Sequence, residues 1–185
     1  MKKTLRQIKL LERLAHHPVE KTKKDRLILK GICNLPEFKK AKNILFYTPI
    51  KGEVDISKIL KKSKTKKFVL PRINGNKLDL HYIEDLSQAE ENKFKILEPK
   101  KNLPKAKPQD IDLAIIPGVV FSDNGHRVGY GKGFYDRFLK KTLAVKIGVA
   151  YRFQIVKNIP GEKHDVPMEI IITENKTMRI KHNTL

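Results

Sequence analysis

Three glycines alternate with other residues around a lysine in the second half of the chain. Residues 127–136 run from an arginine to an aspartate, and within them Gly129, Gly131 and Gly133 flank Lys132. Glycines allow a ligand to approach the backbone closely, and a lysine among them adds a mobile positive charge. The segment is therefore a candidate cradle for a phosphate group.

The flanks of this loop predict a strand before it and a helix after it. Residues 111–117 form a short apolar run that ends at Pro117, which is typical of a buried strand. After the loop, apolar residues recur at helical spacing and predict a helix over about residues 132–142. A strand, a glycine loop and a helix N-terminus together present backbone N–H groups and a partial positive charge to an anion.

The loop does not match the best-known glycine fingerprints. A Walker A loop requires a hydroxyl residue after its lysine, where this chain has Gly133. A dinucleotide loop requires a further glycine at position 134 or 136, and these positions hold Phe134 and Asp136. By its residues alone, the segment is either a phosphate cradle of another kind or a structural turn.

Length and composition favour a single domain over residues 1–185. The chain contains no run of 18 apolar residues, so we expect no membrane span. Lys9, Glu12 and Arg13 interrupt any apolar core near the basic N-terminus, which argues against a signal peptide. We therefore expect a cytoplasmic protein, and we expect it to be a monomer. Cys33, the single cysteine, excludes an internal disulfide and suggests a buried apolar residue.

The formal net charge of +20 raises the possibility of a polyanionic partner. The lysines are spread along nearly the whole chain, and aromatic residues are not interleaved with them as in a single-strand stacking platform. No zinc finger or ribonucleoprotein signature is present. Nucleic acid is therefore an unlikely main target, although a basic nucleic-acid-binding protein stays an alternative.

The order of predicted elements indicates an α/β fold. Helices are expected at about residues 4–15, 19–33 and 55–62, and strands at 44–48, 67–71, 78–83, 111–117, 146–150, 170–173 and 178–181. Residues 84–109 are polar and contain prolines, so we expect an irregular connection there. Alternating strands and helices predict one three-layer α/β/α domain with a largely parallel central sheet. Functional residues should then gather at the carboxyl ends of the strands.

Several motifs, taken together, closely resemble the 5-formyltetrahydrofolate cyclo-ligase family, also called methenyltetrahydrofolate synthetases. The motifs span essentially the whole chain and appear in the family's order: residues 2–6 at the start, Phe46 with Glu53-Val54, Leu70-Pro71-Arg72, the glycine loop with Phe121 and Asn124-Gly125, and His164-Asp165 with Pro167.

The resemblance implies an ATP- and magnesium-dependent conversion of 5-formyltetrahydrofolate to 5,10-methenyltetrahydrofolate, with release of ADP and phosphate. Phosphorylation of the formyl oxygen would turn it into a good leaving group, and a neighbouring amine of the same folate would close the ring. The enzyme would contribute positioning and charge stabilisation. A different small acid as substrate of an ATP-using enzyme with the same fold is a second alternative.

The resemblance also assigns roles to individual residues. Lys132 is the expected catalytic residue, because it would stabilise the transferred phosphoryl group. The residues expected at the nucleotide are Lys2, Arg6, Arg127, Val128, Gly129, Tyr130, Gly131, Lys132, Gly133, Phe134 and Tyr135. Those expected at the folate are Tyr47, Glu53, Tyr130, Gly131, Lys132, Gly133 and Phe134.

Asp136 and Asp165 match the positions expected to bind magnesium, which takes one or two carboxylates beside phosphate and water oxygens. Without the resemblance, Asp136 would be a first-turn helix carboxylate and Asp165 a turn residue. Two departures stand out. Tyr130 occupies a position that is arginine in some members, and Glu169 stands where an aspartate is common near the site. The positive surface would attract polyglutamylated folates.

Overall fold

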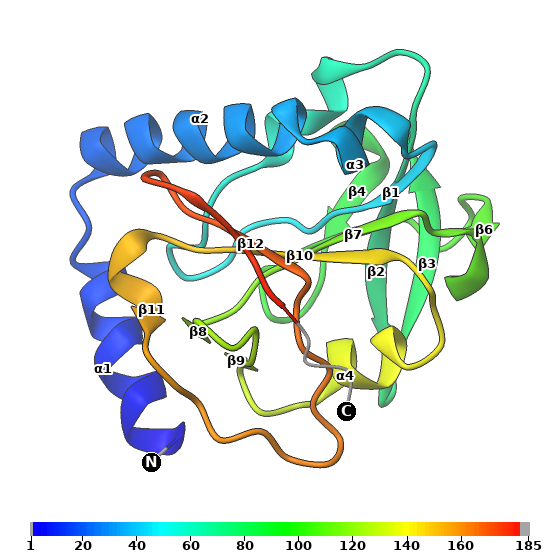
Figure 1. Ribbon diagram of the computed structural model, residues 1–185. Coiled ribbons are helices and arrows are strands. Elements are labelled where there is room, and N and C mark those ends of the chain that lie inside the picture. The colour runs from blue at the N-terminus through cyan, green and yellow to red at the C-terminus, as the bar shows by residue number, and fades with distance from the viewer. Residues whose placement is uncertain (1, 182–185) are drawn as a thin grey trace.

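The structure is a computed structural model and describes residues 2–181 (Figure 1). Its helices are α1 (Lys2–Leu14), α2 (Pro18–Asn34), α3 (Pro36–Lys40) and α4 (Phe134–Leu139), with 3₁₀ turns η1 (Ser57–Lys62), η2 (Leu86–Gln88), η3 (Pro108–Asp110) and η4 (Arg152–Gln154). No described helix is both long and apolar enough to cross a membrane.

A large sheet of eight strands forms the centre of the fold. In spatial order its strands are β13 (Thr177–Arg179), β12 (Ile170–Ile172), β10 (Val145–Val149), β7 (Leu113–Ile116), β1 (Asn43–Leu45), β2 (Lys67–Asn74), β3 (Lys77–Ile83) and β6 (Lys105–Ala106). The five strands from β12 to β2 are parallel, and antiparallel pairing occurs only towards the two edges. The predicted α/β class with a largely parallel sheet is confirmed.

Two smaller sheets complete the strand inventory. β8 (Val120–Ser122), β9 (Arg127–Val128) and β11 (Ile155–Val156) form one of them. β4 (Ala89–Glu91) and β5 (Leu97–Pro99) form an antiparallel pair. In the first of these sheets, β9 leads directly into the glycine loop.

Alternate residues of the central strands feed two separate cores. In β7, Leu113 and Ile115 pack with α2 and α3, whereas Ala114 and Ile116 pack with Phe138 of α4 on the opposite face. This alternation follows from the two-residue period of a strand, and both faces are apolar because both are covered. Figure 1 shows α2 and α3 above the sheet and α4 below it. The three layers are therefore unequal, since α4 has only six residues; Phe121 belongs to the same core as Phe138 of this helix.

Several predicted elements are confirmed, and others need correction. α1 and α2 match the predicted N-terminal helices, and the hairpin from β2 to β3 turns at Gly75, whose φ is +57°. The final strands pair as β12 and β13. The predicted helix over residues 55–62 is instead the 3₁₀ turn η1, and the strand over 44–48 ends at Leu45.

Two further predictions fail for local reasons. The helix predicted over residues 132–142 begins only at Phe134, because Gly133 adopts a left-handed conformation with φ +63°. It ends at Leu139, where the N–H of Lys141 bonds to the Phe138 carbonyl in a tighter turn. The connection over residues 84–109 is not wholly irregular, since it contains β4, β5 and β6.

Candidate active site

A cleft of about 420 Å³ opens at the carboxyl ends of the central strands. α1, the loop after β1, the loop after β7, the glycine loop and the segment from Glu162 to Asp165 contribute to its wall. The loops after β1 and β7, where the parallel sheet predicts candidate residues, both line this cleft. Every predicted site residue lines this cleft: Lys2, Arg6, Tyr47, Glu53, Arg127, Val128, Gly129, Tyr130, Gly131, Lys132, Gly133, Phe134, Tyr135, Asp136 and Asp165.

Two of the three glycines in the loop are required by the backbone itself. Gly131 and Gly133 have φ values of +89° and +63°, a region that L side chains rarely adopt. A Cβ on Gly133 would also lie 2.8 Å from Nη1 of Arg137. Gly129, in contrast, would have no neighbour within 4 Å of an added Cβ. The loop is therefore a tight turn and a wall of the cleft at the same time.

Side-chain cations supply most of the positive charge near the loop. α4 is too short for a large dipole, because the macrodipole grows from aligned peptide units. Lys132 is exposed at the cleft, and no ion pair between it and a carboxylate occurs within residues 2–181. Arg6 of α1 donates from Nε to the Gly129 carbonyl at 2.7 Å, which holds the helix beside the loop.

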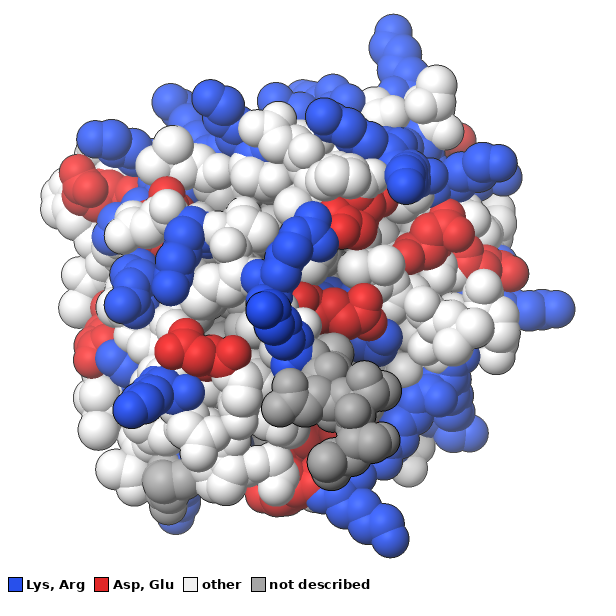
Figure 2. All heavy atoms as spheres, viewed as in Figure 1, with Lys and Arg blue, Asp and Glu red and all other residues white. Residues whose placement is uncertain are grey.

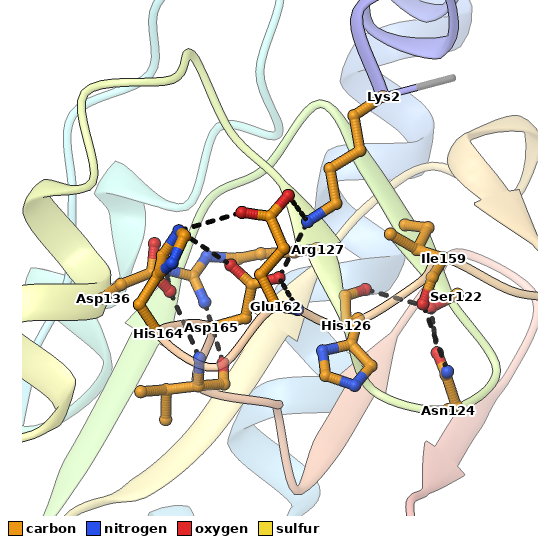
Figure 3. A network of polar contacts seen from close by, with 11 residues as sticks. Lys2, Ser122, Asn124, His126, Arg127, Asp136, Ile159, Glu162, His164 and Asp165 are labelled. Atoms are coloured by element: carbon orange, nitrogen blue, oxygen red, sulfur yellow. Dashed lines mark hydrogen bonds and ion pairs between the residues drawn. The ribbon is translucent and has the colours of Figure 1, made fainter.

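Lys2 links the start of α1 to the segment after β11 across the cleft (Figure 3). Its Nζ lies 2.8 Å from Oε1 of Glu162 and 2.9 Å from Oδ2 of Asp165. Desolvation lowers the pKa of Lys2, but hydrogen bonds to Glu162 and Asp165 outweigh it, so the pKa is raised. Lys2 is thus a charged group held at the cleft by carboxylates.

The two aspartates predicted to bind metal are both paired with cations. Arg127 donates from Nη2 to Oδ1 of Asp136 at 2.8 Å, and the N–H of Val166 donates to the same oxygen. Oδ2 of Asp165 accepts from Lys2 and from the N–H of Glu162. Desolvation raises the pKa of Asp165, but these hydrogen bonds prevail and lower it, which favours the carboxylate.

The donor chemistry of this region suits a hard cation. Carboxylate oxygens are the ligands that Mg²⁺ prefers, and Oδ2 of Asp136 takes part in none of the hydrogen bonds among the described residues. Ligand atoms of Glu162, His164 and Asp165 also lie within 4.8 Å of one another. The residues therefore fit a hard divalent cation such as Mg²⁺.

The other end of the cleft is buried and contains a carboxyl group. Glu53 is 3% exposed, and its Oε2 accepts from the N–H of Ile50 at 3.1 Å. Burial raises the pKa of Glu53 to about 7, although Arg13 acts in the opposite direction. Tyr47 donates its hydroxyl proton to the carbonyl of Val54 at 2.7 Å, and burial raises its pKa well above the usual value. These residues form a low-dielectric end, unlike the exposed glycine loop.

Some residues singled out by position lie away from the cleft. Glu169 pairs with Lys146 at 2.7 Å and does not line the cleft, so a direct role near the site is not supported. Arg72 bonds to Glu90 and the Pro99 carbonyl instead. Cys33 is half-buried against the first core.

Sequence reasoning missed the apolar wall of the cleft. Its members come from β2, β3 and the β4–β5 hairpin: Leu70, Ile73, Leu78, Ile96 and Leu97, together with Pro71 of the Leu-Pro-Arg motif. Buried Glu98 accepts from the N–H of Ile73 and so joins the hairpin to β2. The apolar pair Ile96-Leu97 within an otherwise polar connection was the available signal. Arg13 was also missed, because an arginine on an amphipathic helix is usually solvated.

An open α/β sheet with a cleft at its carboxyl edge, lined by cations and by apolar side chains, is the arrangement in which α/β enzymes commonly bind their ligands. Comparison with known proteins narrows the class. Residues 1–174 match the 5-formyltetrahydrofolate cyclo-ligase family, and the chain belongs to this family. It is therefore a ligase of folate one-carbon metabolism.

Individual relatives agree with the family match. The chain is 32% identical over 168 residues to 5-formyltetrahydrofolate cyclo-ligase of Haemophilus influenzae, covering 85% of this chain and 87% of that protein. The corresponding enzyme of Mycoplasma genitalium is 31% identical, with 92% and 96% coverage. The solved structure of Aquifex aeolicus 5,10-methenyltetrahydrofolate synthetase superposes with a TM-score of 0.89 at 34% identity, over 100% of this chain and 95% of that one.

Proposed function

We propose that the protein converts 5-formyltetrahydrofolate to 5,10-methenyltetrahydrofolate at this cleft, using ATP and releasing ADP and phosphate. The observation that carries the proposal is that the two ends of the cleft differ in chemical character. Cations from α1 and the glycine loop line one end, and a buried carboxyl group beside an apolar wall forms the other. A nucleotide's phosphates and a folate's pterin ring need these two environments side by side.

The chemistry requires the formyl oxygen to become a leaving group. The γ-phosphoryl group of ATP is transferred to that oxygen, which makes the formyl carbon electrophilic. The second amine of the same folate then attacks this carbon, and phosphate departs as the ring closes. Because the folate supplies both nucleophiles, the protein's contribution is alignment and charge stabilisation.

At the phosphate end, Lys132 would stabilise charge on the transferred phosphoryl group. Lys2 and Arg6 face the same cleft from α1, and Arg127 anchors Asp136 beside them. Oriented cations in a partly enclosed site stabilise developing charge more than cations in water do. Lys2 would exchange its carboxylate partners for phosphate oxygens when the nucleotide binds.

Magnesium belongs to this proposal as the ion that neutralises phosphate charge. Asp136 and Asp165 are the residues proposed to hold it, as the family resemblance implies. When bound, the ion would offset the negative charge of the phosphate groups.

At the folate end, the apolar wall would pack against the pterin ring, and Glu53 would accept hydrogen bonds from its N–H groups. Tyr47 and Tyr130 line the same region. A buried carboxylate discriminates strongly in favour of a ligand with matching N–H donors, since otherwise it is left unpaired. The ring edge of a reduced folate offers such donors.

The remaining surface is compatible with a polyanionic tail on the substrate. Figure 2 shows lysines and arginines scattered over the visible face, with acidic groups between them, rather than one basic stripe. Such a field would raise the encounter rate with polyglutamylated folates. We further propose that the protein acts in the cytoplasm as a one-domain monomer. The family match removes the reason to favour nucleic acid as the main target.

The test is a turnover assay with purified protein, ATP, Mg²⁺ and 5-formyltetrahydrofolate. The methenyl product absorbs in the near ultraviolet, so absorbance should rise with time and ADP should appear in equal amount. Omission of ATP, of Mg²⁺ or of the folate should each abolish the rise. A protein that is folded by circular dichroism yet gives no product under saturating conditions would refute the proposal.

A further inference from the structure

α1 buries an arginine and exposes several of its apolar side chains. Arg13 is 1% exposed and is the one buried residue of this helix, whereas Ile8, Leu11 and Leu14 are 48%, 70% and 61% exposed. Burial of an unpaired guanidinium is costly, so the site must contain compensating partners. Arg13 therefore has a role that a hydrophobic anchor could not perform.

The Arg13 guanidinium bonds to three loops at the carboxyl edge of the sheet. Its Nε donates to the Lys51 carbonyl at 2.8 Å, and Nη1 donates to the Gly118 carbonyl at 3.1 Å. Its Nη2 donates to the hydroxyl of Tyr130 at 2.5 Å. The three acceptors come from the loop after β1, the loop after β7 and the glycine loop. A planar guanidinium can satisfy such a divergent set, whereas an ammonium group cannot match its geometry.

The compensating negative charge comes from Glu53. Its Oε1 lies 4.0 Å from Nη1 of Arg13, and both side chains are almost completely buried. The Tyr130 hydroxyl, which accepts from Arg13, also lies near enough to the Glu53 carboxyl to help lower its pKa. Arg13 and Glu53 are buried, Tyr130 is partly buried, and the three form one polar cluster beside the apolar end of the cleft.

Other charged or titratable groups also face Glu53. Tyr47 follows β1, Tyr135 belongs to α4, and Lys21 of α2 acts on Glu53 only through its charge. Only Arg13 combines a positive charge with near-contact distance, since Lys21 pairs with Asp25 at 2.7 Å.

We propose that Arg13 is a positioning residue for the reaction: it keeps the Glu53 carboxylate ionised and orients the Tyr130 hydroxyl, so that both can accept or share hydrogen bonds with the folate ring. This inference rests on the proposed function. Arg13 need not touch either substrate, because it does not line the cleft. Its effect passes through the carboxylate and the phenol.

The electrostatics of the site support this role. Burial raises the pKa of Glu53 to about 7, and Arg13 is the strongest influence in the opposite direction, ahead of the Ile50 N–H and the Tyr130 hydroxyl. Without Arg13 the carboxyl group would be mostly protonated at neutral pH. A protonated carboxyl presents a donor on one oxygen and could no longer accept two hydrogen bonds from the ligand.

The direct test follows Glu53 in the ligand-free protein by NMR with ¹³C-carboxyl-labelled glutamate. The Glu53 resonance is assigned by its loss in Glu53→Gln. Its titration midpoint should rise by about one pH unit in Arg13→Met, as expected on removing a nearby guanidinium. Tyr130→Phe should raise it by less, and Lys9→Met, which removes a cation of α1 paired with Glu12, should leave it unchanged.

Kinetics provide the second readout. As the pH is lowered, the KM for 5-formyltetrahydrofolate should begin to rise at a higher pH in Arg13→Met than in the unmodified protein, because Glu53 takes up its proton earlier. The KM for ATP should change less than about twofold. A purely structural role would raise both KM values without moving the pH profile. If Arg13→Met does not fold, Arg13→Lys should hold the midpoint near that of the unmodified chain, because the charge is kept, and Tyr130→Phe should still shift it.

The outcomes separate the two proposals. An unchanged Glu53 midpoint in folded Arg13→Met would overturn the role of Arg13; if that variant does not fold, an unchanged midpoint in Tyr130→Phe would overturn it. If the unmodified protein turns over no folate, the proposed function fails instead, and the NMR titration still decides whether Arg13 controls the charge of Glu53.

Discussion

The two ends of the cleft use charge in different ways. At the proposed phosphate end, Lys132 is exposed on a glycine loop, and Lys2 is held by two carboxylates near the surface. At the proposed folate end, Glu53 and Arg13 are buried, accept from or donate to backbone groups, and lie beside each other. Exposed charges contribute little to stability but can act strongly on a ligand, whereas buried charges couple binding to folding and to pH.

The largest expected effect is on catalysis at the exposed end. Lys132→Ala should lower kcat by on the order of 10² to 10³-fold, a size typical of removing one preorganised group that stabilises transition-state charge. The free energy of unfolding should change by less than about 0.5 kcal/mol, because the side chain is exposed. Steady-state kinetics measure kcat, and urea unfolding measures the free energy of unfolding.

A matched control for Lys132 is Lys141→Ala. Lys141 is also exposed but lies outside the cleft, so its loss should change neither quantity. Unaltered kcat in Lys132→Ala would remove that residue from the phosphoryl-transfer step and weaken the contrast between the two ends.

The next effect is the pH dependence of stability at the buried end. The pKa of Glu53 is raised from 4.5 to about 7 in the folded protein, so between these values the folded state holds a proton that the unfolded state has lost. The stability contribution is fully present below pH 4.5 and is lost as pH rises towards 7. The change amounts to about 3 kcal/mol. Chemical unfolding of the unmodified chain and of Glu53→Gln across pH 4.5–8 measures the difference.

In Glu53→Gln this part of the pH dependence should disappear, because glutamine does not titrate. Equal slopes in the two proteins would show that Glu53 is not the group responsible. The KM for the folate should rise in the same variant, while the KM for ATP stays near its original value.

A smaller effect separates backbone requirements from ligand contacts within the glycine loop. Gly133→Ala should destabilise the fold by about 1–2 kcal/mol, since its φ is +63° and the new Cβ would meet Arg137. Gly129→Ala should cost less than about 0.5 kcal/mol, because no atom lies within 4 Å of the added Cβ. Thermal unfolding of the two variants tests this prediction. Equal losses of stability in Gly133→Ala and Gly129→Ala would mean that backbone strain is not concentrated at Gly133.

The smallest effect on stability is expected for Lys2→Met at the surface. Its two ion pairs are partly exposed, and such pairs are worth about 0.2–1 kcal/mol. The KM for ATP should nevertheless rise severalfold, because the variant removes a cation at the phosphate end. A loss of stability without any change in the KM for ATP would assign Lys2 a structural role only.

The pattern of residues predicted the central architecture well. Short apolar runs such as residues 111–117 could belong to buried strands, and the structure places β7 within that run. Elements whose limits depend on one local conformation were less predictable. α4 begins late because Gly133 is left-handed. Residues 84–109 form strands because β4 pairs with β5 and β6 pairs with the distant β3, and this pairing is not visible in the local sequence.

By itself, the sequence determined the α/β class, because that depends on local periodicity, and the family, because its motifs are residue types in a fixed order along the chain. The roles of the glycine-loop residues follow from the resemblance and stay predictions. Only the tertiary structure decided that Lys2 and Asp165, 163 residues apart, form an ion pair, and that Arg13 lies beside Glu53. It also decided that Glu169 lies outside the cleft. The physical reason is that burial and proximity between distant segments set the charge and partners of a side chain, and neither is encoded by its neighbours in the chain.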